Sequence, residues 1–383
     1  MNIFYWSPFI SKVATVSSVI RSAESIVNFS KKKNEVSIID SIGEWEEYKN
    51  KINSEVKIIK INKINYYKFL PRGGYIKSRV SYLIIFFLNF FKLLNLINFR
   101  KPDYLIIHLM TSLPIFLSIF FNKKTKIVLR VSGLPKLNFL RYFFWKIFAN
   151  KIYKVTCPTS ETYKSLLKKK IFCKEKLCVV RDPVLVLKEF AKKKFETINE
   201  FNINKKKFLI GIGRLTKQKN FSLLINAFKE IEKKYNEYSL IILGDGEEKT
   251  KLISLIKSYN LEEKVHLIGY KDNVYKYLKN ADCFILTSLW EDPGFVLIEA
   301  GLSNSIVISS NCKNGPEEIL NNENNGYLFK NNDLKDLLRK FDEFKSEDKN
   351  KLFKKKLNLK KEIKKFTFYS HFKSLNNIIN LNN

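Results

Sequence analysis

FLIGIGRLTKQKNF, residues 208–221, is the stretch of sequence that indicates the fold. It begins as an apolar run of strand type, passes through Gly211 and Gly213, and becomes polar and basic before Phe221 opens an amphipathic helical pattern. A strand that ends in glycines and leads straight into a helix is typical of parallel α/β sheets, where ligands bind beyond the carboxyl ends of the strands. We therefore expect a ligand site in the loop that follows this strand.

The same alternation of short apolar runs and helical periodicity extends through most of the chain and indicates the α/β class. A length of 383 residues favours two domains, because it exceeds one ordinary core. The Lys- and Asn-rich stretch after Asp182-Pro183 lacks a strong apolar period and is interpreted as a connection. We predict a Rossmann-like domain over 1–187, a linker over 188–207, a second Rossmann-like domain over 208–345, and C-terminal helices over 346–383 that return to the first domain.

Individual strands and helices follow from the same pattern. In the first half we expect strands at Ile3–Trp6, Glu35–Ile39, Lys57–Ile61, Tyr104–His108, Lys126–Val131, Lys154–Cys157 and Leu177–Arg181, with helices at Ala14–Asn28, Arg79–Leu96 and Phe139–Asn150. In the second half we expect strands at Phe208–Gly213, Ser239–Leu243, Val265–Ile268, Cys283–Thr287 and Ile306–Ser310, with a helix at Phe221–Tyr235. Each half should form a doubly wound parallel sheet.

The chain is strongly basic, with a formal net charge of +32, and residues 1–190 carry 34 basic against 12 acidic side chains. Such an excess attracts phosphates, nucleic acid or an anionic membrane surface, but an AT-rich genome would also produce it without any partner. No zinc finger, helix-turn-helix or aromatic RNP motif is present, so nucleic acid is not an expected partner. The five cysteines form no C-x-x-C pair and only three histidines occur, so no metal site is expected.

Met1 leads directly into a strand-like run without a basic n-region or a small-residue cleavage site, which predicts a cytoplasmic protein. Two apolar stretches resemble membrane spans. Val80–Phe99 is interrupted by Asn and Lys, and Tyr104–Phe121 by His108 and Pro114. Neither reaches about eighteen uninterrupted apolar residues, so neither is predicted to cross a membrane.

Among the basic residues of the loop that follows the strand 208–213, Arg214 and Lys219 are the candidates for binding a phosphate. A guanidinium can bind a diphosphate with two parallel hydrogen bonds, and a lysine ammonium can add a point charge from the same loop. The Gly-x-Gly pair does not match the P-loop, which requires G-K-[ST] after its second glycine. The alternative is that both side chains are merely solvated on the surface of a basic chain.

Two carboxylates seven residues apart occur in the stretch Thr287–Gly301, which ends a strand, turns at Pro-Gly and starts a helix. Glu291 is expected in the loop and Glu299 in the helix, where the helix start at residues 294–296 offers free backbone N–H groups. This arrangement can hold a phosphate on amides and sugar hydroxyls on carboxylates. The alternative is that Glu299 is a surface charge and Glu291 a partner of the helix dipole.

Residues 208–330 resemble the nucleotide-sugar domain of glycosyltransferase family 4, which has the GT-B fold. The resemblance rests on four motifs in order: G-R-L-x-x-x-K-N at Gly213–Asn220, G-D-G at Gly244–Gly246, an A-D strand ending in Thr-Ser at Ala281–Ser288, and E-x7-E closing in E-A-G at Glu291–Gly301. It implies two Rossmann-like domains facing across an interdomain cleft. It also implies sugar transfer with retention of configuration and without a metal cofactor, because cationic side chains stabilise the leaving diphosphate.

By the same resemblance, Arg214 and Lys219 bind the donor diphosphate, Glu299 the ribose hydroxyls, and Glu291 the transferred sugar beside the reacting carbon. The remaining donor-binding positions are Gly213, Gly269, Tyr270, Gly294, Phe295 and Val296. The segments Ser309–Ile319 and Asn325–Phe329 are expected to shape the wall of the donor pocket.

The N-terminal half departs from the family pattern, because the usual Gly-Gly pair after the first strand is replaced by Trp6-Ser7-Pro8-Phe9-Ile10-Ser11-Lys12. Ser7, Ser11 and Lys12 can make similar hydrogen bonds to an acceptor. His108 closes a strand where the family often has a histidine near the scissile bond, although a lone histidine can also be a core residue. Arg130, at the end of the next strand, is a further acceptor-side candidate.

These features predict a retaining glycosyltransferase that moves a sugar from a nucleotide sugar, with UDP as the expected carrier. The expected acceptor is a glycan or lipid-linked oligosaccharide of cell-envelope polysaccharide or lipopolysaccharide biosynthesis. The basic, aromatic run Arg141–Lys146 and the apolar helix Arg79–Leu96 suit peripheral docking on an anionic membrane, unless these aromatics are simply core. Two other functions stay open: another GT-B enzyme such as an epimerase or phosphorylase, and a non-catalytic basic protein that binds nucleic acid or membrane.

Overall fold

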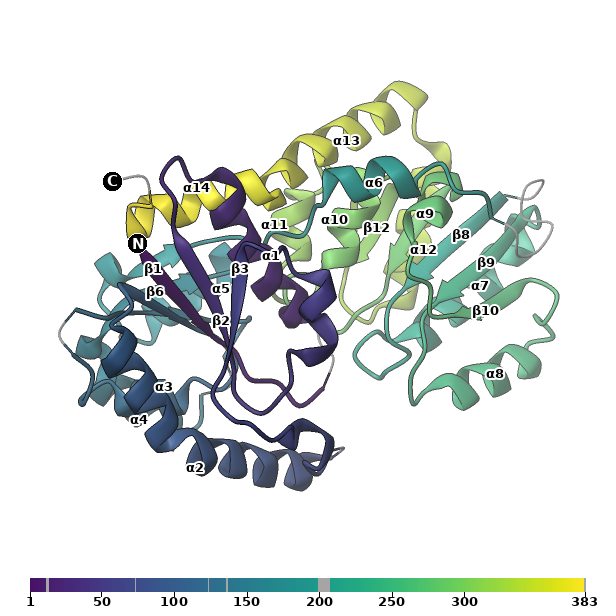
Figure 1. Ribbon diagram of the computed structural model, residues 1–383. Helices are drawn as coiled ribbons and strands as arrows, with labels where there is room; N and C mark the ends of the chain where they lie inside the picture. The colour runs from purple at the N-terminus through teal and green to yellow at the C-terminus, as the bar shows by residue number, and fades with distance from the viewer. Residues whose placement is uncertain (12–13, 73, 123, 136, 199–206, 382–383) are drawn as a thin grey trace. The chain divides into compact units, whose positions relative to one another are not determined.

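The computed structural model describes all residues except 12–13, 73, 123, 136, 199–206 and 382–383. The chain divides into two compact units (Figure 1). The first comprises Met1–Val184 and Phe368–Asn383, and the second comprises Leu185–Thr367.

The first unit is built on a seven-stranded parallel sheet with the order β3-β2-β1-β4-β5-β6-β7. Its strands are β1 (Asn2–Trp6), β2 (Glu35–Asp40), β3 (Val56–Lys60), β4 (Tyr104–Ile107), β5 (Lys126–Arg130), β6 (Ile152–Cys157) and β7 (Leu177–Val179). The strand order reverses between β1 and β4, which makes this a doubly wound sheet with its switch point at these two strands.

Helices cover both faces of this sheet. They are α1 (Ala14–Phe29), α2 (Tyr75–Arg100), α3 (Ser112–Leu117), α4 (Phe139–Phe148), α5 (Ser160–Lys168) and α14 (Phe368–Ile379). Along β1, Ile3 and Tyr5 pack into a core shared with α1 and α14, whereas Phe4 and Trp6 pack into a core shared with α2, α4 and α5. The near-continuous apolar run of β1 follows from burial on both faces.

The second unit has a six-stranded parallel sheet with the order β10-β9-β8-β11-β12-β13. Its strands are β8 (Lys207–Ile212), β9 (Tyr238–Leu243), β10 (Val265–Gly269), β11 (Cys283–Leu286), β12 (Ile306–Ser310) and β13 (Tyr327–Phe329). Its helices are α6 (Leu187–Lys193), α7 (Phe221–Lys234), α8 (Lys249–Ser258), α9 (Tyr275–Asn280), α10 (Phe295–Leu302), α11 (Pro316–Leu320), α12 (Leu334–Ser346) and α13 (Lys349–Glu362). The switch point lies between β8 and β11.

Two predicted segment boundaries differ from the structure. The predicted linker 188–207 contains most of α6, which belongs to the second unit: Phe190 packs edge-on against Tyr275 of α9, with ring centroids 5.1 Å apart. Part of that linker, residues 199–206, lies outside the described residues. The C-terminal helices are also divided, since α13 stays in the second unit and only α14 joins the first.

The position of α13 has a local cause. Its Leu359 and the following Ile363 are both 1% exposed and lie against Gly301 of α10, where a Cβ would come within 2.8 Å of the Leu359 side chain. The glycine of the E-A-G motif therefore provides the space in which this helix packs.

Helix α2 is longer than the predicted Arg79–Leu96. By length and composition alone, its residues Ile76–Arg100 could cross a membrane, and only 28% of the most apolar window is buried. That this stretch is not a membrane span stays a prediction. Exposed apolar side chains on this helix include Ile76, Leu83, Phe87 and Phe91, which recur at helical spacing.

Candidate nucleotide-sugar site

The donor-binding candidates of the second unit gather at the carboxyl ends of its central strands. Lys219 lies in the loop between β8 and α7, and Glu291 in the loop between β11 and α10. Because β8 and β11 flank the switch point, their loops diverge and leave room for a ligand there. The two side chains nevertheless meet: Nζ of Lys219 lies 2.5 Å from Oε1 of Glu291.

The ion pair of Lys219 and Glu291 is largely shielded from water, with side-chain exposures of 13% and 5%. The methylene chain of Lys219 runs along Gly213, where a Cβ would come within 3.0 Å of the Lys219 Cε. Ser288, also buried, donates a hydrogen bond of 2.5 Å to the same Glu291 oxygen. The glycine and the serine thus fix the geometry of the pair from both sides.

The G-D-G loop supports the loop that carries Arg214 and Lys219. Leu215 donates its backbone N–H to the Asp245 carbonyl at 2.9 Å, and Gly213 donates to the Leu243 carbonyl at 3.0 Å. A Cβ on Gly244 would lie 1.8 Å from the Gly213 carbonyl oxygen. Only glycine allows two backbone segments to approach so closely, which explains this motif structurally.

The loop that carries Glu291 is tied to both of its neighbours. Gln218 donates from its side chain to the Trp290 carbonyl at 2.9 Å, and the Glu291 N–H donates to the Lys313 carbonyl at 3.2 Å. Gly294, with φ of 93°, caps α10. The N–H groups of the first turn, at Phe295 and Val296, have no acceptor within the helix and suit an anion.

Other donor-binding candidates surround this pair. Arg214 is exposed, at the opposite end of the loop from Lys219. Glu299 lies one helical turn into α10 and is half-buried. Tyr270 follows Gly269, whose φ is 82°; its phenol pKa is raised by partial burial, by its hydrogen bond to Asp272, and by the nearby charges of Asp272 and Glu299. The predicted residues therefore come from three loops, those after β8, β10 and β11, at one edge of the sheet.

Ser288 and Gln218 were not among the predicted site residues. Ser288 occupies the second position of the Thr-Ser strand end, so the motif contained a signal for it. Gln218 had no such signal, because its partner is a backbone carbonyl 72 positions away.

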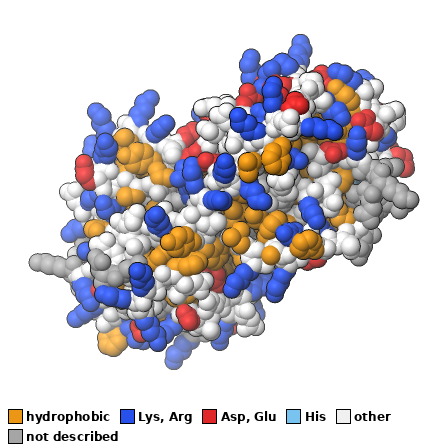
Figure 2. Space-filling model, turned by 90° about the horizontal axis from the view of Figure 1, so that it is seen from above, with side chains coloured by type: hydrophobic (Ala, Val, Ile, Leu, Met, Phe, Trp, Pro, Cys, Tyr) orange, Lys and Arg blue, Asp and Glu red, His pale blue; other side chains and the backbone are white. Residues whose placement is uncertain are grey.

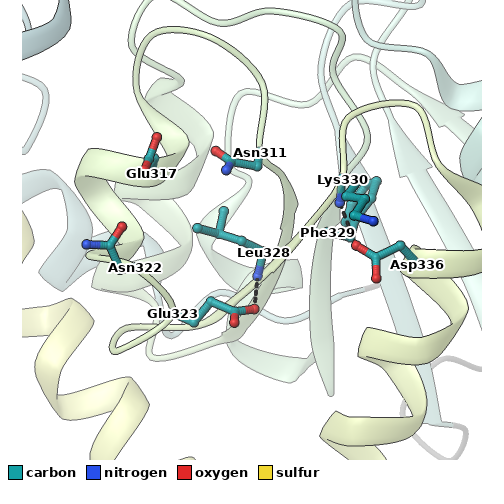
Figure 3. A pocket seen from close by; sticks show the side chains of 8 residues that line it. All are labelled: Asn311, Glu317, Asn322, Glu323, Leu328, Phe329, Lys330 and Asp336. Carbon is teal, nitrogen blue, oxygen red and sulfur yellow. Dashed lines mark hydrogen bonds between the residues drawn. The ribbon is translucent and has the colours of Figure 1, made fainter.

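A polar hollow of about 280 Å³ lies beside the ends of β12 and β13 (Figure 3). Its wall includes Asn311, Leu328 and Phe329, which fall in the segments predicted to shape the donor pocket. Glu323 accepts a hydrogen bond from the Leu328 N–H at 2.8 Å, and Asp336 accepts one from the Lys330 N–H at 2.7 Å. Both carboxylates thus stabilise the local backbone.

Two candidates of the first unit, the acceptor-side Ser7 and the catalytic candidate His108, meet at its own switch point. Ser7 follows β1 and His108 follows β4, and the His108 N–H donates to the Trp6 carbonyl at 2.8 Å. Both are buried; Oγ of Ser7 and Nδ1 of His108 have no hydrogen-bond partner in the described part of the chain. Nε2 of His108 lies 3.0 Å from Oγ of Ser132. Burial, and then the charge of Arg130, lower the pKa of His108 well below its ordinary value, so the ring is neutral.

The other acceptor-side candidates are placed differently. Arg130 is 7% exposed and forms a buried ion pair with Asp182, which also accepts a hydrogen bond from Ser18. Its charge is thus compensated within the unit. Ser11 is exposed, and Lys12 lies outside the described residues.

Among the described residues, no group of three or more His, Cys, Asp or Glu side chains is arranged to hold a metal ion. Three of the five cysteines, Cys157, Cys283 and Cys312, are buried, and none of the five forms a disulfide. Burial raises the pKa of the Cys157 and Cys312 thiols to about 12, so both stay protonated.

Residues 193–366 match the model of the family described as glycosyl transferases group 1. The chain is 36% identical over 250 residues to an uncharacterized glycosyltransferase of Methanocaldococcus jannaschii, covering 60% of this chain and 61% of that protein. It is 30% identical over 215 residues to the N-acetylgalactosamine-N,N'-diacetylbacillosaminyl-diphospho-undecaprenol 4-alpha-N-acetylgalactosaminyltransferase of Campylobacter jejuni, covering 54% of this chain and 57% of that protein. The match thus spans about 60% of the length of these curated relatives.

Solved structures extend the similarity to the whole chain. HepE of Anabaena, in complex with UDP, superimposes with a TM-score of 0.74 at 13% identity, covering 99% of this chain and 100% of that one. TarM of Staphylococcus aureus superimposes with a TM-score of 0.73 at 15% identity, covering 99% and 98%. At this identity the likeness establishes the fold, which is the predicted GT-B fold with two Rossmann-like sheets.

Proposed function

We propose that the protein transfers a sugar from a nucleotide sugar to an acceptor with retention of configuration, because residues 193–366 match the model of the glycosyl transferases group 1 family. The observation that carries this proposal is the contact between Lys219 and Glu291 at the switch point of the second sheet. It places a cation and a carboxylate side by side where a phosphorylated ligand would bind.

The donor's diphosphate would lie over the first turn of α10, within reach of Arg214 and Lys219. Glu299 would accept hydrogen bonds from the ribose and Glu291 from the transferred sugar. As the bond between sugar and diphosphate breaks, negative charge grows on the phosphate oxygens. Cations and helix-start amides that are already in position stabilise this charge without reorganisation. These groups supply what a metal ion would supply, so we propose that transfer is independent of metal.

UDP is the proposed nucleotide, because HepE and TarM have been crystallised with it. The proposed acceptor is a glycan or lipid-linked oligosaccharide of the cell envelope. Support comes from the names of relatives that act in amylovoran and lipopolysaccharide core biosynthesis, and from the diphospho-undecaprenol acceptor in the name of the Campylobacter protein. We propose that the protein works at the cytoplasmic face of a membrane, to which it binds peripherally.

The decisive test is turnover of UDP-sugars by purified protein in the presence of EDTA, with acceptor lipid extracts added. Glu291→Gln should reduce turnover at least 100-fold, because the carboxylate is lost at the sugar. Arg214→Ala should reduce turnover at least 10-fold through the diphosphate, without unfolding, because Arg214 is exposed. The matched control is Lys217→Ala, which removes an exposed positive charge from the same loop and should keep wild-type turnover.

Equal turnover by Glu291→Gln and wild type would refute the assignment of the site. Identification of the product separates the alternatives, since an epimerase returns a nucleotide sugar and a phosphorylase yields a sugar phosphate. Retention is read from the anomeric configuration of the isolated product. Loss of turnover in EDTA, restored by Mg²⁺, would contradict the proposed independence of metal.

A further inference from the structure

A groove of about 1120 Å³ lies within the first unit, between α2 and α4. Its floor is the loop after β4, from Leu109 to Ser112, and its walls include Tyr82 of α2 and Leu140 and Phe144 of α4. Leu140 is 76% exposed. Figure 1 shows α2, α3 and α4 together on one side of the sheet. The groove is therefore mostly apolar, and it opens at a helix whose apolar face is also exposed.

Two guanidinium groups, those of Arg79 and Arg141, stand at this groove. Both side chains line the same groove, one from α2 and one from α4. Partial burial, and then the positive charge of Arg79, hold the pKa of Arg141 below its ordinary value. Arg141 also lies over the ring of Trp145, 4.8 Å from its centroid, which holds it at the groove. Neither α2 nor α4 contains an acidic residue. Two neighbouring arginines beside an apolar groove are complementary to a phosphate on an apolar chain.

The groove also reaches the acceptor side of the sheet. Ser132, which lines it, lies 3.0 Å from Nε2 of His108. Leu109, the residue after His108, has φ of 58°, a conformation that branched L-residues rarely adopt. The loop is held in this form by Trp6, whose indole N–H donates to the Met110 carbonyl at 2.9 Å. Strained backbone of this kind is frequent at ligand sites.

We propose that this groove binds the carrier of the acceptor, a lipid with a phosphate or diphosphate at the end of a long apolar chain. The phosphate lies between Arg79 and Arg141, the chain runs over Leu140 and the apolar face of α2, and the sugar end points toward His108. This assignment rests on the proposed glycosyl transfer and names its acceptor class. A second copy of the chain is a poor occupant, because it would bring a net charge of +32 against a groove that is already cationic.

Titration calorimetry with the full-length protein and three probes tests the assignment. The probes are farnesyl diphosphate, farnesol and inorganic diphosphate, each below its aggregation concentration. We expect farnesyl diphosphate to bind at least ten-fold more tightly than either of the other two. Arg79→Gln and Arg141→Gln should each weaken its binding about ten-fold and leave farnesol binding unchanged. The control Arg100→Gln removes a cation from the same helix outside the groove and should bind like wild type.

Binding of farnesyl diphosphate no tighter than inorganic diphosphate, or unchanged by Arg79→Gln, would overturn the proposal. Because Arg141 packs on Trp145, its variant is checked by thermal melting, while the exposed Arg79 provides an independent substitution. Titration of UDP on the same variants separates the two proposals. Normal UDP binding with no preference for the isoprenyl diphosphate refutes the groove alone, whereas absence of UDP binding in wild type refutes the donor site alone.

Discussion

The Lys219–Glu291 pair has an electrostatic cost, which the proposed function would explain. Both charges are largely removed from water, and each depends on the other for compensation. Ser288 adds only a neutral hydrogen bond to Glu291. A bound diphosphate would draw the Lys219 ammonium toward itself and free Glu291 for sugar hydroxyls. In the proposed site, the pair would thus hold both side chains in place before a donor binds.

Removing Lys219 and removing Glu291 should have unequal effects on the stability of the protein. Lys219→Met leaves a buried, unpaired carboxylate and should lower the free energy of unfolding by about 3 kcal/mol. Glu291→Gln leaves a lysine whose flexible chain can reach water, so a loss of about 1 kcal/mol is expected. The double variant should be more stable than Lys219→Met alone. Urea unfolding measures all three, with Lys217→Met, an exposed position of the same loop, as control; equal midpoints for Lys219→Met and Lys217→Met would contradict the prediction.

Gly244 allows a prediction about the loop that supports the pair. An alanine Cβ there would overlap the Gly213 carbonyl oxygen, which belongs to backbone and cannot rotate away. Gly244→Ala should destabilise the second unit by about 3 kcal/mol and weaken UDP binding. Gly269→Ala is the matched control, because φ is also positive at 82° but no atom lies within 4 Å of the added Cβ. Gly269→Ala should lower the free energy of unfolding only through the strain of alanine at positive φ, by about 1 kcal/mol. Equal losses of stability would show that the close approach is unimportant.

At the scale of elements, α14 depends on a buried neutral histidine. Nε2 of His371 lies 2.8 Å from Oγ of Ser22 on α1, and its Nδ1 lies 2.7 Å from the Arg181 carbonyl. Burial, and then the charge of Arg130, lower the pKa of His371 to about 3. As the pH falls through about 6.5, His371 therefore takes up a proton in the unfolded chain but stays neutral in the folded chain.

The contribution of His371 to the free energy of unfolding is therefore fully present above about pH 6.5, and it is lost as the pH falls toward about 3. The expected slope is about 1.4 kcal/mol per pH unit for this histidine, and the lowered pKa of His108 adds a loss in the same direction. His371→Gln should reduce the slope between pH 6 and pH 4 by about one proton. Urea unfolding across this range measures it, and an unchanged slope in the variant would contradict the argument.

Local sequence was sufficient for elements that are buried on both sides. The strands around 208–213 and 238–243 were predicted to within one residue, because continuous apolar runs bounded by glycine admit few other structures. The motif order also predicted that Lys219 and Glu291 belong to one site, and the two side chains are in contact in the structure. Their roles in binding and transfer stay predictions.

Other features depend on partners that the local pattern does not reveal. The ends of α2 were missed, because its exposed apolar face weakens the contrast that defines an amphipathic helix. Arg130, an acceptor-side candidate, forms an ion pair with Asp182, which lies 52 positions later and could not be inferred from the local sequence. The place of α13 depends on the space above Gly301, which only the folded unit defines. Long-range packing decided each of these cases.

At the scale of the whole molecule, the basic residues behind the net charge of +32 are distributed along the entire sequence. Figure 2 shows Lys and Arg side chains scattered over the visible face, where they predominate over the acidic ones. A diffuse positive charge draws the protein to any anionic surface, but this attraction is screened by salt. It does not by itself select an orientation. The exposed aromatic residues of α2 can add a contribution that salt does not screen.

Salt should separate the electrostatic attraction from the apolar contact made by α2. At about 50 mM salt the protein should float with phosphatidylglycerol vesicles. At about 500 mM salt the screening length is only a few ångströms, so a reduced fraction of the protein should remain bound, through α2. Replacing Phe87 and Phe91, which are 71% and 70% exposed, with serine should abolish the salt-resistant fraction and spare the salt-sensitive one. Phe353→Ser on α13, where the ring is 65% exposed, is the control and should behave like wild type. If all variants lose binding equally at high salt, charge alone attaches the protein to membranes and α2 does not insert.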